Sequence, residues 1–349
     1  MAEQNKAGLS PKTDTRKTEI SKGILIFNRM GIWVITISLL IIGMIIAAAN
    51  GGQFFSKSNI QSILEAVALY GMVAAGLFYV TYSGNWTDMS IPLTMAMAGM
   101  LTVQSINLGF PVALLIGIAT GLVIGVINGF MIGQLRANPI IWSWGFNLLL
   151  SGIIRVGWGG KQLYADTVAK PTDFAQRSAQ AFYSISRTYI GGIISLMAIV
   201  MLCMFLISYV IHARTSFGQK LKMVGSNYEA ARFSGINTQK ITMLAYMISS
   251  TFAAVGGIFY TALRKTASYE NGTGYDFTCL TCVLLGGTLL SGGKGSVLGT
   301  FGGVLAYGIL NNILSWIGLG TYTKYTVQGV VFLLIVFINT YTERKLGRS

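Results

Sequence analysis

The sequence contains few charges and few of the residues on which catalysis depends. Charged residues make up 10% of the 349 residues, and the chain has 11 acidic residues, one histidine and three cysteines. An average soluble protein has roughly 25% charged residues. So few charges could not cover a water-soluble body of this length, which excludes a soluble enzyme. A membrane-embedded enzyme is also disfavoured, because no His/Glu metal set and no Ser/His/Asp arrangement occurs.

Hydrophobic residues make up 53% of the chain. They fall in blocks of about 18 to 24, the length that a helix needs to cross ~30 Å of hydrocarbon. We therefore expect an all-α, polytopic integral membrane protein. The third and eighth blocks are short and indicate re-entrant or broken helices, so we expect eight to ten spans. The blocks are Ile32–Ala49, Ile60–Tyr82, Ser90–Ile106, Phe110–Gly133, Pro139–Val156, Tyr189–Ile211, Ile241–Leu263, Phe277–Leu290, Val297–Ile317 and Tyr325–Tyr341.

The net charge of +14 lies in the gaps between these blocks. Such a distribution is typical of positive-inside topology and not of a nucleic-acid-binding surface. With ten spans both termini share one side, and 16 of the 25 cations fall on that side. We expect cytoplasmic tails at 1–30 and 343–349 around a transmembrane domain at 31–342. No cleavable signal sequence is evident.

Two apparent motifs carry no chemistry. Cys279-x-x-Cys282 has metal or redox spacing, but there is no second pair, and two small apolar residues in a helix explain it better. The stretch Leu290-Ser-Gly-Gly-Lys-Gly295 looks like a phosphate-binding loop. The stretch does not match that motif, because Thr288 stands where the first glycine belongs and Gly295 stands where a Ser or Thr should bind magnesium.

Glycines recur every fourth residue in the fourth block. Such spacing places them on one helix face, where a ridge without side chains lets a second helix approach closely. We expect helix packing there, and at the shorter ridge of Gly295, Gly299 and Gly303. Non-helical backbone is expected in the glycine-rich stretches 84–92 and 286–295, where it must be buried or line a cavity. The long ridge comprises Gly117, Gly121, Gly125, Gly129 and Gly133.

The cytoplasmic loop 212–240 predicts a short helix outside the membrane. Ser226 followed by Glu229 matches a capping box, and Gly235 is a helix stop. A two-turn helix is marginal in water unless it packs against something. Two interpretations stay open at this point: a connector on the bilayer surface, or a docking helix for a soluble partner.

Several longer motifs resemble one family of transport proteins. The loop contains Thr-Ser-Phe-Gly at 215–218 and Glu-Ala-Ala-Arg-Phe-Ser-Gly-Ile-Asn at 229–237. After it come Gly-Thr-Gly-Tyr at 272–275, Leu-Leu-Gly-Gly-Thr at 284–288, Ser-Gly-Gly-Lys-Gly-Ser-Val-Leu-Gly-Thr at 291–300 and Leu-Asn-Asn at 310–312. In this order and spacing they resemble ribose-type monosaccharide permeases of bacterial ABC importers, within the branched-chain amino acid permease superfamily.

The resemblance implies an inner-membrane pathway formed by two permease subunits, identical or related. It implies a cytoplasmic ABC ATPase as one partner and a periplasmic substrate-binding protein as another. ATP and magnesium would be bound by the ATPase, so we expect no cofactor in this chain. The Glu-Ala-Ala loop would couple permease to ATPase, a role that falls on Ser226, Glu229, Ala230, Ala231, Arg232 and Gly235.

One stretch departs from the family pattern. Ser-Gly-Asn-Trp-Thr-Asp-Met-Ser-Ile-Pro at 83–92 has one residue more than the usual Ser-Gly-Gly-Ile-Asp-Leu-Ser-Val-Gly. It keeps Asp88 and Ser90, but Asn85 replaces a glycine and Trp86 is added. We expect Trp86, Asp88 and Ser90 to lie on the substrate pathway, with a changed backbone shape and pocket volume.

Sugars present apolar C–H faces and a rim of hydroxyls, so aromatic and amide side chains should line their path. Trp142 and Trp144 point about 200° apart on a helix. We favour Trp144, which shares a face with Asn147. Asn311 and Asn312 lie mid-span, where pathway lining and helix–helix hydrogen bonding are both open. Glu65 and Arg155 are charges near the outer ends of their spans.

The alternative function is an ion-coupled secondary transporter. That class commonly buries several acids or histidines as ion relays. Here one clear acid lies within a span, and His212 lies outside, which favours the ATP-driven importer. The cargo stays open among pentoses, hexoses, polyols, furanose signals and nucleosides.

Overall fold

In the computed structural model, residues 12–345 are described. The predicted tails at 1–30 and 343–349 lie partly outside this range, at 1–11 and 346–349. Part of the expected N-terminal tail is helical, because the first helix begins at Lys12 and continues without a break to Ala49. The last helix ends at Lys345. The all-α expectation is confirmed for the described residues, which form helices and two very short strands.

The helices follow one another with short connections. One π-helical turn, η2, prolongs α4, and one 3-10 turn, η1, precedes it. The elements are α1 Lys12–Ala49, α2 Lys57–Tyr82, α3 Ile91–Gln104, η1 Ile106–Leu108, α4 Phe110–Gly129, η2 Phe130–Gln134, α5 Pro139–Trp158, α6 Ala165–Val168, α7 Asp173–Arg187, β1 Tyr189–Ile190, β2 Ile194–Ser195, α8 Leu196–Arg214, α9 Ser216–Ser226, α10 Tyr228–Phe233, α11 Thr238–Arg264, α12 Tyr275–Leu285, α13 Val297–Trp316 and α14 Thr321–Lys345.

Eight helices among the described residues are long and apolar enough to cross a bilayer. The other two apolar blocks form the short helices α3, of 14 residues, and α12, of 11 residues. The expectation of eight to ten spans with two short ones is therefore confirmed. Cys279 and Cys282 are buried in α12 as free thiols.

One boundary was predicted wrongly. The sixth span was expected to begin at Tyr189, but residues 189–195 form the antiparallel pair β1–β2, and α8 begins at Leu196. Gly191 and Gly192 have φ of +62° and +71°, a conformation that turns the chain into a hairpin. The apolar residues around these glycines extend the hydropathy signal without extending the helix.

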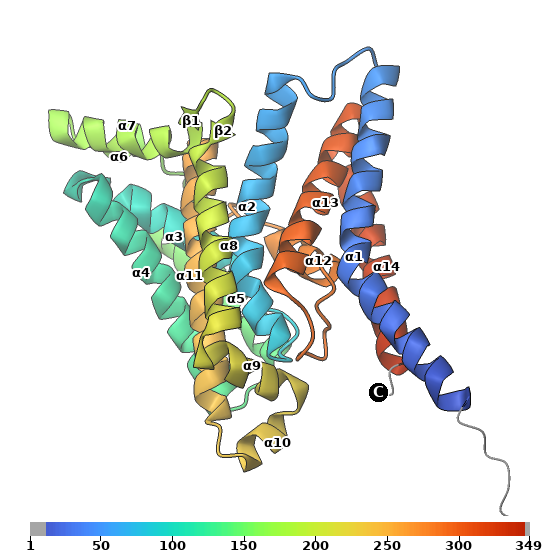
Figure 1. Ribbon diagram of the computed structural model, residues 1–349. Coiled ribbons are helices and arrows are strands. Elements are labelled where there is room, and N and C mark those ends of the chain that lie inside the picture. Colours follow the sequence, from blue (N-terminus) through green and yellow to red (C-terminus); the bar gives the residue numbers. More distant parts are fainter. Residues whose placement is uncertain (1–11, 346–349) are drawn as a thin grey trace, which may run out of the picture.

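Three helices, α2, α11 and α13, are largely buried, and the other long helices surround them. Figure 1 shows that α10, the start of α1 and the end of α14 lie at one end of the molecule. The amphipathic α7 and the β1–β2 hairpin lie at the opposite end. Glu65 near that end accepts a hydrogen bond from the Tyr189 hydroxyl, and Arg155 lies 4.3 Å from the ring centroid of Tyr269.

The glycine ridge of α4 packs on α11. A Cβ on Gly121 would lie 2.4 Å from the Ala254 Cβ, and one on Gly125 would lie 2.6 Å from the Met247 Cα. Gly129 is equally close to the backbone of Met243. The shorter ridge meets α12, since a Cβ on Gly303 would lie 2.0 Å from the Cys282 carbonyl oxygen. Glycine is required at these positions because the neighbouring helix occupies the side-chain space.

Candidate coupling helix and substrate cavity

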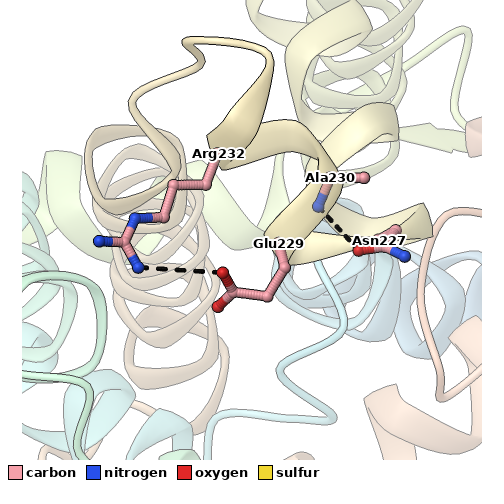
Figure 2. A network of polar contacts seen from close by, with 4 residues as sticks. All are labelled: Asn227, Glu229, Ala230 and Arg232. Atoms are coloured by element: carbon pink, nitrogen blue, oxygen red, sulfur yellow. Dashed lines mark hydrogen bonds and ion pairs between the residues drawn. The ribbon is translucent and has the colours of Figure 1, made fainter.

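The short helix α10 begins one residue later than the capping box predicts. Ser226 is the last residue of α9, and Asn227 is the N-cap of α10, with extended backbone angles. The Asn227 Oδ1 accepts a 2.9 Å hydrogen bond from the Ala230 amide, as Figure 2 shows. The cap is therefore Asn227 and not Ser226. Asn and Ser are equally good N-caps, so the pattern alone did not separate them.

The other end of α10 closes as expected at Gly235, whose φ is +79°. The Gly235 amide donates to the Arg232 carbonyl, and the Ile236 amide donates to the Ala231 carbonyl. This pair of bonds is the Schellman motif that ends helices at glycine. Both ends of a six-residue helix are thus fixed by local hydrogen bonds, which compensates for its small length.

One face of α10 is attached to the protein and the other is free. Ala231 is buried, and the Tyr228 ring lies 5.3 Å from the Arg136 guanidinium on the α4–α5 connection. On the opposite face Glu229 and Arg232 form an exposed ion pair at 3.8 Å (Figure 2). Phe233 is 88% exposed. Phe233 was not chosen from the sequence, because a single exposed aromatic side chain is common on protein surfaces and gives no signal of its own.

The stretch 83–92, which differs from the family pattern, forms a buried polar network. Asp88 accepts hydrogen bonds from the amide and hydroxyl of Ser90, whose hydroxyl accepts one from the Asn128 amide of α4. The Trp142 indole then donates to the Asn128 Oδ1 at 3.0 Å. Trp86 lies apart from this network, half exposed, with a φ of +61°. The network therefore ties the loop to α4 and α5.

The two tryptophans of α5 point in opposite directions, as their spacing requires. Trp142 is turned inward and stacks on Phe146, with ring centroids 5.8 Å apart. Trp144 is 61% exposed on the outer face of α5. Asn147 is half-buried, and its Oδ1 has no hydrogen-bond partner among the described residues. The role predicted for Trp144 and Asn147 stays a prediction, because Trp144 faces outward while Asn147 is half-buried.

The adjacent amides of α13 have different surroundings. Asn312 donates a 2.7 Å hydrogen bond to Asn59 on α2, which also accepts one from Trp316. Asn311 instead faces a cavity, where it lies 3.4 Å from both the Tyr70 hydroxyl and the Gln328 amide. Helix–helix hydrogen bonding therefore describes Asn312, whereas Asn311 makes longer bonds to α2 and α14 and also lines the cavity. That either amide lies on the substrate pathway stays a prediction.

This cavity has a volume of about 630 Å³, within the range of about 300–1,000 Å³ of small-molecule sites. It lies between α2, the end of α11, α12, α13 and α14. Its walls combine aromatic rings, amides and hydroxyls, with two cations and no carboxylate among the described lining residues. The lining residues include Tyr70, Tyr260, Arg264, Tyr275, Thr278, Tyr307, Asn311, Lys324 and Gln328.

Four of the five tyrosines that line the cavity lie close together and form an aromatic wall. The Tyr70 ring lies 5.4 Å from Tyr275 and 5.5 Å from Tyr307, and Tyr260 lies 5.6 Å from Tyr275. The Thr278 hydroxyl lies 3.4 Å from the Tyr307 hydroxyl. These tyrosines were not chosen from the sequence. Their signal was weak, because other tyrosines such as Tyr79, Tyr82 and Tyr246 lie in the same apolar blocks, and only the fold shows which of them come together.

The two cations lie at the margin of the aromatic wall. The Arg264 guanidinium is 5.6 Å from the ring centroid of Tyr260, and the Lys324 ammonium donates a 2.8 Å hydrogen bond to Ser315. A second cavity of about 590 Å³ shares Tyr260 and Arg264 with the first. No group of three or more His, Cys, Asp or Glu residues that could hold a metal occurs within residues 12–345.

Comparison with known proteins decides the family. The model of the branched-chain amino acid transport system permease component matches residues 59–336. The chain belongs to this permease family. It is 31% identical to the ribose import permease protein RbsC of Bacillus subtilis (strain 168), over 86% of this chain and 90% of the relative.

Other relatives of this permease carry related names. It is 25% identical to the L-arabinose transport system permease protein AraH of Escherichia coli (strain K12), over 91% of this chain and 92% of the relative. It is 24% identical to the xylose transport system permease protein XylH of Haemophilus influenzae, over 90% and 97%. No solved structure matches the chain. The family resemblance read from the motifs is thereby confirmed, and the chain is a transport permease with several membrane-spanning helices.

Proposed function

We propose that this permease is the membrane subunit of an ATP-driven importer for a monosaccharide or a related polyhydroxylated solute. Its three relatives above are named for ribose, arabinose and xylose. The observation that carries the proposal is the free face of α10, where Glu229, Arg232 and Phe233 are exposed on a helix capped at both ends. A surface of this kind suits a soluble partner better than lipid, because an ion pair lies beside the aromatic ring.

The proposed partners are a second permease subunit, a cytoplasmic ABC ATPase and a periplasmic substrate-binding protein. The ATPase would bind ATP and magnesium and contact α10. Both termini would then lie in the cytoplasm with α10, in a multi-pass protein of the bacterial inner membrane. Motion of the ATPase would alternately open the pathway to each side, and the chain itself would catalyse no reaction.

The cavity supports a sugar as the transported solute. Aromatic rings offer flat surfaces to the C–H face of a sugar, and the amides of Asn311 and Gln328 can donate to and accept from its hydroxyls. The bonds these amides make with each other and with Tyr70 are long, at 3.4 Å. A solute hydroxyl can therefore replace them at small cost.

The test is substrate-stimulated ATP hydrolysis by the reconstituted complex, with D-ribose, D-xylose and L-arabinose as the solutes tried. We expect Glu229→Lys and Gly235→Pro to abolish the stimulation, and Phe233→Ala to weaken it. Lys240→Glu, a charge reversal at the exposed start of α11, is the matched control and should retain it. Undiminished stimulation in Glu229→Lys and Gly235→Pro would refute the role of α10.

Uptake into lipid vesicles that contain the reconstituted complex distinguishes the ATP-driven importer from an ion-coupled transporter. Uptake of a radiolabelled sugar should need ATP and the ATPase subunit. Uptake driven by a sodium or proton gradient, without ATP, would instead establish the secondary transporter.

A further inference from the structure

Three separate parts of the backbone meet beside α10, and the Ser226 hydroxyl is the one side-chain atom among the closest neighbours of their glycines. They are the end of α2, the joint between α9 and α10, and the connection between α12 and α13. We call this meeting point the glycine junction, and define it by Gly84, Gly225, Gly292 and Gly293. The Gly293 amide donates a 2.9 Å hydrogen bond to the Tyr82 carbonyl at the end of α2.

The space at the junction is filled by backbone. A Cβ on Gly225 would lie 2.0 Å from the Tyr82 carbonyl oxygen and 2.7 Å from the Gly293 nitrogen. A Cβ on Gly292 would lie 2.6 Å from the Gly84 nitrogen. Atoms of different chain segments are thus already in van der Waals contact. Packed protein has low compressibility, so a displacement on one side of such a contact reaches the other side.

On one side the glycine junction is continuous with α10. Gly225 and Ser226 end α9, and the next residue, Asn227, caps α10. A Cβ on Gly293 would lie 2.7 Å from the Ser226 Cα. The backbone that begins α10 therefore lies directly against the α12–α13 connection.

On the other side the junction leads to the walls of the cavity. The α12–α13 connection joins the helices that carry Tyr275 and Tyr307, and α2 carries Tyr70. Within the same connection, the Thr288 carbonyl accepts a 3.1 Å hydrogen bond from Asn339 of α14, the helix that carries Gln328. Four of the five helices lining the cavity are thus reached from one point.

We propose that the glycine junction transmits the displacement of α10 to the helices that line the cavity. This proposal rests on the proposed function, because it assumes that an ATPase moves α10. Side chains between the segments could absorb a displacement by changing rotamer, whereas direct backbone contacts pass it on. The glycine-rich stretch that imitates a phosphate-binding loop then has a mechanical role: Gly292 and Gly293, with φ of +82° and +68°, let the connection approach α2 and α9.

The variant that tests the junction is Gly225→Ala. Gly225 lies within helix α9, where alanine is the better helix former, so the backbone accepts the change and only the contact with Tyr82 and Gly293 is disturbed. Gly320→Ala is the matched control, because a Cβ there meets nothing within 4 Å. Asn339→Leu is the second variant, which removes the hydrogen bond to Thr288 at similar side-chain volume.

The measurements are assembly of the complex, basal ATP hydrolysis, sugar-stimulated hydrolysis and sugar uptake. We expect Gly225→Ala to assemble and keep basal hydrolysis while stimulation and uptake fall roughly tenfold or more. Asn339→Leu should reduce uptake in the same way, and Gly320→Ala should match the wild type. If Gly225→Ala does not assemble, Asn339→Leu decides by the same measurements.

Stimulation and uptake within about twofold of wild type in the assembled variants would overturn the role of the junction. A wild-type complex without any sugar-stimulated hydrolysis would overturn the proposed function, and this inference with it. The two failures are therefore distinguishable by the wild type alone.

Discussion

Tyr82, the last residue of α2, accepts a 2.9 Å hydrogen bond from Gly293, which lies more than two hundred residues later in the chain. The bond joins the most buried spanning helix to the connection between α12 and α13. It lies beside the start of α10, so α10 and the cavity walls meet at one place.

The cap of α10 can be tested by a pair of adjacent substitutions. Asn227→Ala removes the acceptor of the Ala230 amide and should cost about 1 kcal/mol, which raises local hydrogen exchange in α10 roughly fivefold. Ser226→Ala leaves this hydrogen bond in place and should change exchange little. Mass-spectrometric hydrogen exchange over 228–234 measures both. The reverse order of effects would restore Ser226 as the cap.

Substitutions of the two neighbouring amide side chains of α13 should have different effects, one on transport and the other on stability. Asn311→Leu removes a cavity amide and should lower sugar uptake roughly tenfold, with the thermal midpoint in detergent unchanged. Asn312→Leu breaks the bond to Asn59 and should cost about 1–3 kcal/mol of stability. Uptake is normalised to assembled complex. Equal uptake in wild type and Asn311→Leu would remove Asn311 from the pathway.

Substitutions of the two tryptophans of α5 should also differ in their effects on stability and on transport. Trp142→Ala loses the bond to Asn128 and the stacking on Phe146, and should cost about 3 kcal/mol or more. Trp144→Ala removes an exposed ring and should leave assembly intact while impairing uptake. Thermal unfolding and vesicle uptake give the two readouts. Normal uptake in Trp144→Ala would leave Trp144 as a surface residue only.

Asp88 gives the stability a pH dependence. Burial raises the pKa of its carboxyl above the ordinary value of 3.8, although hydrogen bonds from Ser90 and Asn128 oppose the shift. The pKa of Asp88 is therefore higher in the folded state than in the unfolded state. The contribution of Asp88 to the free energy of unfolding is most favourable below the unfolded-state pKa, and it is lost as pH rises through the folded-state pKa. Asp88→Asn should flatten this dependence in thermal unfolding measured across acidic pH. Asp173→Asn, at an exposed position, is the control; the same flattening there would remove Asp88 as the cause.

The fold could be predicted largely from the lengths of the apolar blocks, because hydrocarbon thickness sets a minimum length for each span. The error at Tyr189 arose where hydropathy and backbone geometry disagree: isoleucines around Gly191 and Gly192 are apolar, yet two residues at positive φ end a helix. The glycine spacing of α4 identified a packing face, since a period of four follows one helix face.

The site was harder to predict because it depends on contacts between distant blocks. Asn311 and Asn312 differ by one helical step of about 100°, so only the neighbouring helices decide which one faces the cavity. Tyr70, Tyr260, Tyr275 and Tyr307 belong to four different helices, and no local pattern connects them. The family motifs located α10 correctly, while its cap was misplaced by one residue because Ser226 and Asn227 are both suitable.

The close seating of α4 on α11 limits which parts of the protein can move. With Cα, Cβ and carbonyl atoms of α11 occupying the side-chain space of successive glycines, neither helix can slide along the other without a steric collision. We therefore expect the two helices to move as one body, with Tyr260 and Arg264 at the end of α11 forming a fixed wall of the cavity. In the proposed importer, alternation between the two sides of the bilayer would then fall to the other walls of the cavity, made by α2, α12, α13 and α14.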